Sequence, residues 1–220
     1  MVRETRSTAA ALAPLTAGGP EGNERLTVVT GLVLIVLLAV LGVTIVRIGQ
    51  LLWLHLFLGL VLLGPILLKL LSTGYRFVRY YTSDPAYRRK GPPPVQLRIL
   101  GPVVVILTAV VFATGVVLLL LGRSSRGPFV LLHKVSFIVW IVATAVHVLG
   151  HLPEITKLFG TARVARAELQ ALDSAGAGSG SLASEDLPGG AGRTLSLGAA
   201  LVAGLVLAVV LIPQFAAWTH

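Results

Sequence analysis

Long apolar stretches follow one another along most of the chain, and polar residues are concentrated between them. Five stretches reach the roughly 20 apolar residues that an α-helix needs to cross the hydrocarbon core of a bilayer. They lie at residues 26–46, 51–71, 97–121, 129–152 and 195–217. The first starts too late and is too long to be the apolar core of a secretory signal, so we expect it to be retained.

The polar segments indicate how the chain is divided. Residues 1–25 are rich in Ala, Gly, Pro and Thr, which predicts a disordered tail, and residues 153–194 pass from a short helix-like piece into a Gly/Ser-rich cytoplasmic linker. We therefore predict an all-α integral membrane protein with about five transmembrane helices. Residues 26–152 would form a four-helix bundle core, and 195–220 an accessory C-terminal span on a loose tether.

The segment between the second and third spans, residues 72–96, is strongly basic. By the positive-inside rule it is cytoplasmic, which places the N-terminus of this cell-membrane protein inside and the C-terminus outside. The basic residues, set against the acid Asp84, are Arg76, Arg79, Arg88, Arg89 and Lys90. Aromatic residues alternate with them, as is typical of an anchor at the level of the lipid headgroups. They are Tyr75, Phe77, Tyr80, Tyr81 and Tyr87.

Composition excludes several classes of protein. With 55% hydrophobic residues and a mean hydropathy of +0.88, the chain fits a lipid bilayer and not a soluble domain. The net charge of +9 comes from basic residues beside apolar spans, where they meet anionic lipid, so nucleic acid is not an expected partner. The chain has no cysteine, which excludes disulfides, thiolate-bound iron–sulfur clusters and haem attached through C-x-x-C-H.

Three of the five histidines lie in the fourth span, although polar groups inside a membrane are costly and usually mark a site. His133 and His147 are 14 residues apart, which brings a helix to within about 40° of a whole number of turns, and His151 follows one turn later. The three side chains are therefore predicted to share one face. In the second span His55 and Lys69 are also 14 residues apart, so they too should share a face.

His55 and His133 each stand about four residues into a span that enters from the outside, which predicts the same depth for both. Two imidazoles on two helices suit a haem iron held from both sides, with the porphyrin between the helices. Gly59, one turn below His55, would leave room for the haem. Gly115 belongs to a seven-residue repeat of small residues, which indicates either haem clearance or close helix packing. The repeat comprises Gly101, Thr108, Gly115 and Gly122.

Over about residues 26–152, the pair His133 and His147 resembles the pattern of the membrane b-type cytochromes, in which such pairs on two helices of a four-helix bundle hold two stacked haems. The resemblance implies a haem-b-binding electron-transfer protein, acting as the membrane subunit of an oxidoreductase beside a redox partner subunit and exchanging electrons with quinone. Lys69 stands where the matching histidine would be, so one haem is expected and a second is left open. Lys69, His147 and His151 would then form an inner site for a quinone headgroup or a proton relay.

The alternative function is a cofactor-free membrane scaffold or assembly protein, whose histidines and lysine bond between helices and whose basic loop docks a partner or lipid. The first function predicts a coloured protein and the second a colourless one. A small transporter is a third candidate, but the chain shows no inverted repeat. A hydrolytic enzyme is disfavoured because the spans have no deep carboxylate, no G-x-S-x-G element and no H-E-x-x-H motif.

Overall fold

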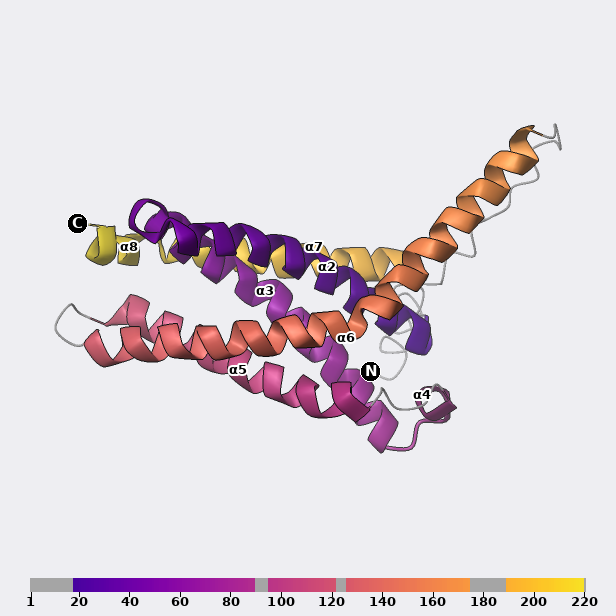
Figure 1. The fold of residues 1–220 in the computed structure, drawn as a ribbon, viewed down its shortest axis with the longest axis horizontal. Helices are drawn as coiled ribbons and strands as arrows, with labels where there is room; N and C mark the ends of the chain where they lie inside the picture. The colour runs from indigo at the N-terminus through magenta and orange to yellow at the C-terminus, as the bar shows by residue number, and fades with distance from the viewer. Residues whose placement is uncertain (1–17, 90–94, 122–125, 175–188, 220) are drawn as a thin grey trace, which may run out of the picture.

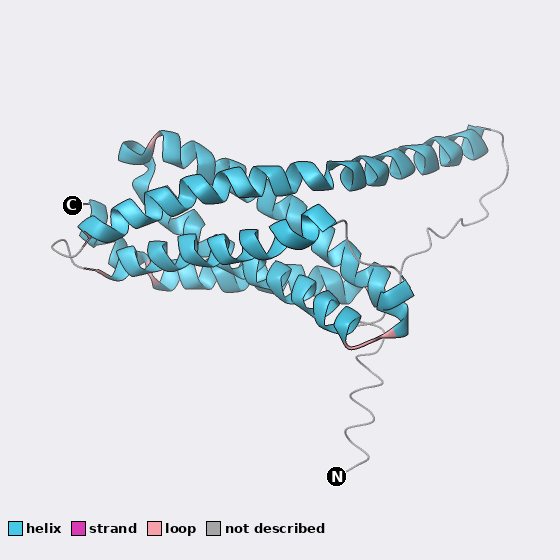
Figure 2. Cartoon of the chain, turned by 60° about the horizontal axis from the view of Figure 1, so that its bottom comes forward, coloured by secondary structure: helices cyan, strands magenta, loops and turns pink. Residues whose placement is uncertain are grey.

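The computed structural model describes residues 18–89, 95–121, 126–174 and 189–219, which are almost entirely α-helical and contain no β-strand (Figures 1 and 2). The helices are α2 (Gly19–Val46), α3 (Ile48–Tyr81), α4 (Pro85–Arg89), α5 (Val95–Leu120), α6 (Gly127–Ser174), α7 (Gly190–Val210) and α8 (Ile212–Thr219). Within the described residues, α2, α3, α5, α6 and α7 each contain an apolar stretch long enough to cross a membrane. The prediction of an all-α, multi-pass membrane protein is confirmed.

The long helices form two groups. α2, α3 and α7 pack against one another, and α5 and α6 form an antiparallel hairpin beside them (Figure 1). α3 is the central helix, because it contacts α2, α5, α7 and α8. An apolar cluster of Leu34, Leu62 and Ile66 joins α2 to α3, with Phe112 of α5 packed against it.

The short helix α8 ties the two groups together at the end opposite α4 (Figure 1). A second buried cluster there draws one residue from each of four helices; its members are Leu60 of α3, Leu119 of α5, Ala208 of α7 and Phe215 of α8. Arg126, just before α6, places its guanidinium 3.8 Å from the centre of the Trp218 ring and donates a hydrogen bond to the carbonyl oxygen of Ala217. Both contacts join the start of α6 to α8.

α7 meets α3 with no side chain between the two backbones. A Cβ atom added at Gly64 would lie 1.9 Å from the carbonyl oxygen of Ala200, and one added at Gly204 would lie 2.1 Å from that of Val61. Such close approach is possible only at glycine and is a common device of membrane helix pairs. α7, predicted as an accessory span on a loose tether, therefore packs directly against the central helix α3.

Helix boundaries differ from the predicted ones in three places. α2 begins at Gly19, inside the predicted tail, because Pro20 and Glu21 suit the first turn of a helix. α6 continues through Pro153 to Ser174, inside the predicted linker, and its second half leaves the bundle (Figure 1). A proline removes one backbone hydrogen bond, which bends a helix more readily than it ends one.

The third difference lies at the C-terminus, where the predicted single span is divided into α7 and α8 at Leu211. Pro213 lies in the first turn of α8, where its missing N–H group leaves no helical hydrogen bond unmade. Residues 1–17 of the predicted tail and 175–188 of the predicted linker lie outside the described residues.

The contact between α3 and α7 predicts opposite effects for two glycine substitutions on α7. Gly204→Ala should destabilise the protein by about 1–3 kcal/mol, because its methyl group has no space. Gly198→Ala is the matched control, since a Cβ there meets no atom within 4 Å, and it should be neutral or stabilising by up to about 1 kcal/mol. Thermal unfolding in detergent measures both. Equal melting temperatures for the two variants would contradict the backbone contact.

Candidate functional site

His55 lies in α3 and is oriented by α2. Its Nδ1 atom is 3.0 Å from Oγ1 of Thr44, whose only hydroxyl hydrogen is donated to the carbonyl oxygen of Leu41. The threonine oxygen therefore accepts a hydrogen bond from Nδ1–H of His55. This arrangement fixes the ring as the tautomer that carries its hydrogen on Nδ1 and leaves the lone pair on Nε2.

His133 in α6 is oriented in the same way by α5. Its Nδ1 atom is 3.0 Å from Oγ1 of Thr114 and 3.1 Å from the carbonyl oxygen of Val111. A carbonyl oxygen only accepts, and the hydroxyl hydrogen of Thr114 is already donated to its own helix, so Nδ1 of His133 is the donor. Nε2 of His133 again carries the lone pair.

The two imidazoles lie close enough to interact electrostatically although they belong to different groups of helices. Within the described residues, neither Nε2 atom has a hydrogen-bond partner, whereas both Nδ1 atoms do. The two histidines thus offer two nitrogen lone pairs, one from α3 and one from α6. A metal-bound histidine has this same form, with its second nitrogen donating to an oxygen of the surrounding protein.

The glycines predicted near these histidines have different roles. A Cβ added at Gly59 would meet no atom within 4 Å, so there is open space beside α3 one turn from His55. A Cβ at Gly115 would lie 3.3 Å from Cε1 of His133, so Gly115 admits the histidine ring itself. For Gly115, the structure therefore shows close packing of α5 on α6, one of the two interpretations of the small-residue repeat.

The same repeat aligns α5 with α6 one step further along. Nε1 of Trp140 donates a 2.8 Å hydrogen bond to Oγ1 of Thr108, and both side chains are buried. Trp140 follows His133 by seven residues, and Thr108 precedes Gly115 by seven. By this register, Gly101 and His147 lie at the same level of the hairpin. Gly122 lies outside the described residues.

Lys69 also reaches α2, at the other end of the α2–α3 pair from His55. Its ammonium donates a 2.9 Å hydrogen bond to the carbonyl oxygen of Thr27, and it passes over Gly31, where a Cβ would be 2.8 Å from Nζ. Thr27 and Asn23 both bond to Ser72, which completes a polar cluster between the two helices. His55 and Lys69 therefore share a face of α3, as their spacing predicts.

The inner site predicted from Lys69, His147 and His151 stays a prediction. His147 lies in the apolar part of α6, and His151 follows in the same helix, but the side chain of His151 is outside the part of the structure that is described. The described residues contain no group of three or more His, Cys, Asp or Glu side chains that could hold a metal ion. A haem iron with two axial histidines needs only two such side chains.

The two threonines are functional candidates that the sequence analysis missed. Thr44 and Thr114 are buried, and each lies inside an apolar span. The sequence does show a hydroxyl residue inside each of these spans. It does not show which histidine each threonine contacts, because that depends on which helices pair and in which register.

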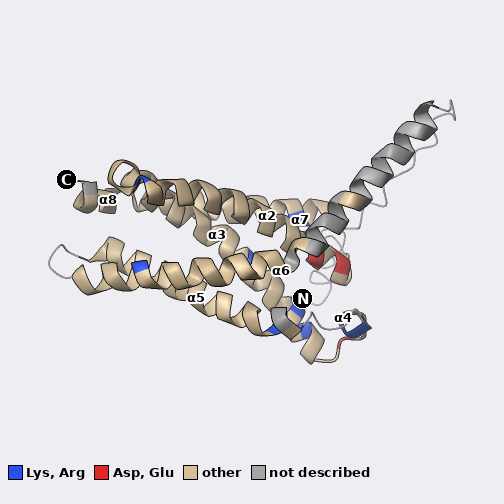
Figure 3. Ribbon diagram, viewed as in Figure 1, with Lys and Arg blue, Asp and Glu red and all other residues tan. Residues whose placement is uncertain are grey.

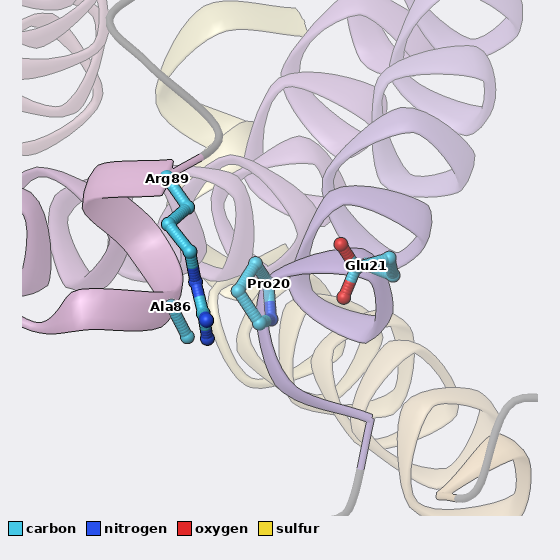
Figure 4. Close-up of a pocket in the computed structure, with 4 residues that line it drawn as sticks. All are labelled: Pro20, Glu21, Ala86 and Arg89. Atoms are coloured by element: carbon cyan, nitrogen blue, oxygen red, sulfur yellow. The ribbon is translucent and has the colours of Figure 1, made fainter.

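A shallow depression on the surface lies between the start of α2 and the short helix α4. It is lined by Pro20, Glu21, Ala86 and Arg89, and the side chain of Arg89 runs past Ala86 toward Pro20 (Figure 4). None of the predicted site residues contributes to it.

Comparisons with protein-family models, with curated proteins and with solved structures found no match to this chain. The fold establishes the class, which is an all-α multi-pass membrane protein. A more specific function has to be argued from the two histidines.

The hydrogen bonds at the two histidines predict their tautomers before any ligand is added. In cofactor-free protein labelled with ¹⁵N-histidine, His55 and His133 should give signals of the Nδ1–H form, because oxygen acceptors face Nδ1. The variants His55→Gln and His133→Gln assign the two signals. The Nε2–H form, which dominates in free neutral histidine, would contradict the geometry at whichever residue shows it.

Proposed function

We propose that this protein binds one haem b between α3 and α6, with Nε2 of His55 and Nε2 of His133 as the axial ligands, and that it transfers electrons within the membrane. The observation that carries the proposal is the matched pair of histidines. They stand on different helices, each is held through Nδ1 by a threonine, and each Nε2 is unbonded among the described residues.

The chemistry of the two side chains fits this cofactor. Bound haem supplies reversible one-electron chemistry at its iron. Thr44 and Thr114 hold the imidazole rings and raise their basicity by accepting from Nδ1–H. Gly59 leaves open space beside His55, and the apolar residues of the spans keep water away from the site.

The wider function follows from the same proposal. Electrons would pass to or from a redox partner subunit and the quinone pool, with the protein as the membrane subunit of an oxidoreductase in the cell membrane and its N-terminus in the cytoplasm. Support for a quinone comes from Lys69, because an ammonium can donate three hydrogen bonds and this one makes a single bond among the described residues. A quinone carbonyl oxygen could accept one of the others.

The first test measures haem directly in protein expressed with ample haem and purified in mild detergent. A pyridine haemochrome assay should give about one haem b per chain, and the visible spectrum should change reversibly on reduction, as one bis-histidine site requires. His55→Ala and His133→Ala should each abolish haem binding, because each removes an axial ligand.

The matched control for these variants is His220→Ala, which removes a histidine outside the spans and should retain the haem. Colourless wild-type protein would refute the proposal. Retention of haem by both axial variants would refute the ligand assignment.

A second test addresses the threonines as positioning residues. Thr44→Val and Thr114→Val keep the shape of the side chain but remove the acceptor for Nδ1–H, so haem affinity should fall about 10–100-fold. The reduction potential should become more positive, because a less basic imidazole stabilises ferric iron less. Thr108→Val is the control, since its hydroxyl serves Trp140 and no histidine. A purely structural role would lower the melting temperature without moving the potential.

The cofactor-free scaffold is the second candidate, and one observation favours it. Asn23, Thr27, Lys69 and Ser72 form hydrogen bonds between α2 and α3, as expected of polar groups that specify helix packing. In this function the two histidines would serve the same purpose, and the protein would be colourless.

A further inference from the structure

Arg126 and Trp218 are in contact at the end of the protein opposite α4. The guanidinium of Arg126 lies 3.8 Å from the centre of the indole ring and donates a hydrogen bond to the carbonyl oxygen of Ala217. Nε of Arg126 and Nε1 of Trp218 are both buried, and neither has a hydrogen-bond partner among the described residues. A buried N–H group without an acceptor is costly, and a bound group that accepts from it is one physical explanation.

The chain offers no acidic side chain to pair with Arg126 in this region. No Asp or Glu occurs at residues 25–83, 85–153 or 187–220, which include all five apolar stretches of the sequence. In Figure 3 the described acidic residues lie toward the end where α2 begins, and none lies beside α8. Among the described residues Arg126 forms no ion pair. An anion that completes this contact therefore has to come from a bound molecule.

Arg126 lies on the same face of α6 as His133. Arg126 stands at the start of α6, because its carbonyl oxygen accepts a hydrogen bond from the N–H group of Val130. Seven residues separate it from His133, which is within about 20° of two full turns and about 10 Å along the helix. In the proposed function a haem lies beside His133, and haem b carries two propionate carboxylates at one edge of its ring.

We propose that Arg126 and Trp218 bind a propionate carboxylate of the haem, an inference that rests on the proposed function. A guanidinium matches a carboxylate in shape and charge, and an indole N–H group only donates, so one carboxylate can accept from both. The first backbone N–H groups of α6 also favour an anion at this position. A lipid phosphate is disfavoured, because both unbonded donors are buried.

The test uses an iron-free porphyrin, so that binding does not depend on the axial histidines. Cofactor-free protein in mild detergent is titrated with protoporphyrin IX and with its dimethyl ester, which has no carboxylate, and porphyrin fluorescence gives each affinity. Wild-type protein should prefer the acid by about tenfold or more, as a charge-assisted hydrogen bond requires. Arg126→Gln should remove most of this preference. Trp218→Phe keeps a ring but removes the N–H group, so it should reduce the preference about fivefold.

The matched control is Lys134→Gln, which removes an exposed cation from the same helix and should retain the preference. Equal binding of acid and ester by the wild type, or equal losses in Arg126→Gln and Lys134→Gln, would overturn the carboxylate site. Loss of the preference on addition of phosphatidylglycerol would also overturn it, since the donors would then serve a lipid phosphate. If Arg126→Gln does not fold, an unchanged preference in Trp218→Phe would overturn the site instead.

The same titrations separate this inference from the proposed function. Wild-type protein that prefers protoporphyrin IX to its ester but takes up no haem would refute the axial ligands and support the carboxylate site. Wild-type protein that binds haem through His55 and His133 but binds acid and ester equally would refute the carboxylate site alone.

Discussion

The hydrocarbon core of a bilayer offers no hydrogen-bond partner to a polar side chain, and this constraint decides which helices of the protein pair. His55 and Lys69 both extend from α3 to oxygen atoms of α2, and His133 and Trp140 both extend from α6 to oxygen atoms of α5. Each pair of helices is thus joined by polar contacts at two levels along its length. Such contacts are worth only about 1 kcal/mol each in a membrane, but a mispaired helix would leave them unsatisfied.

The central helix α3 uses one face for polar contacts with α2 and another face for close backbone packing with α7. Gly64 follows His55 by nine residues, which is half a turn beyond two full turns, so the two residues lie on opposite faces of the helix. The His55 face bonds to α2, and the Gly64 face takes the backbone of α7 in direct contact. α7 needs no polar group in its middle for this, because the absence of side chains is what lets the helices approach.

How much of the structure can be predicted from the sequence depends on how far apart in the sequence the interacting residues are. Apolar length alone predicts the spans, and helical periodicity alone predicts that His55 and Lys69 share a face. The partner of His55 is not predictable in the same way, because Thr44 is one of several hydroxyl residues in the spans and its role depends on helix pairing. The contact at Gly204 requires the crossing point of two helices that are distant in sequence. The continuation of α6 past Pro153 reflects a backbone that tolerates one missing hydrogen bond.

The division of the helices into two groups determines how a ligand bound by His55 and His133 would affect stability. Apart from contacts of α3 and α8 with α5, the α5–α6 hairpin has little joining it to α2, α3 and α7. His55 belongs to one group and His133 to the other, so a metal held by both nitrogens would add a direct link between them. Because such a ligand binds only when both groups are assembled, its binding free energy adds to the stability of the assembly. In the proposed function, electron transfer and correct packing of the hairpin would therefore depend on the same two side chains.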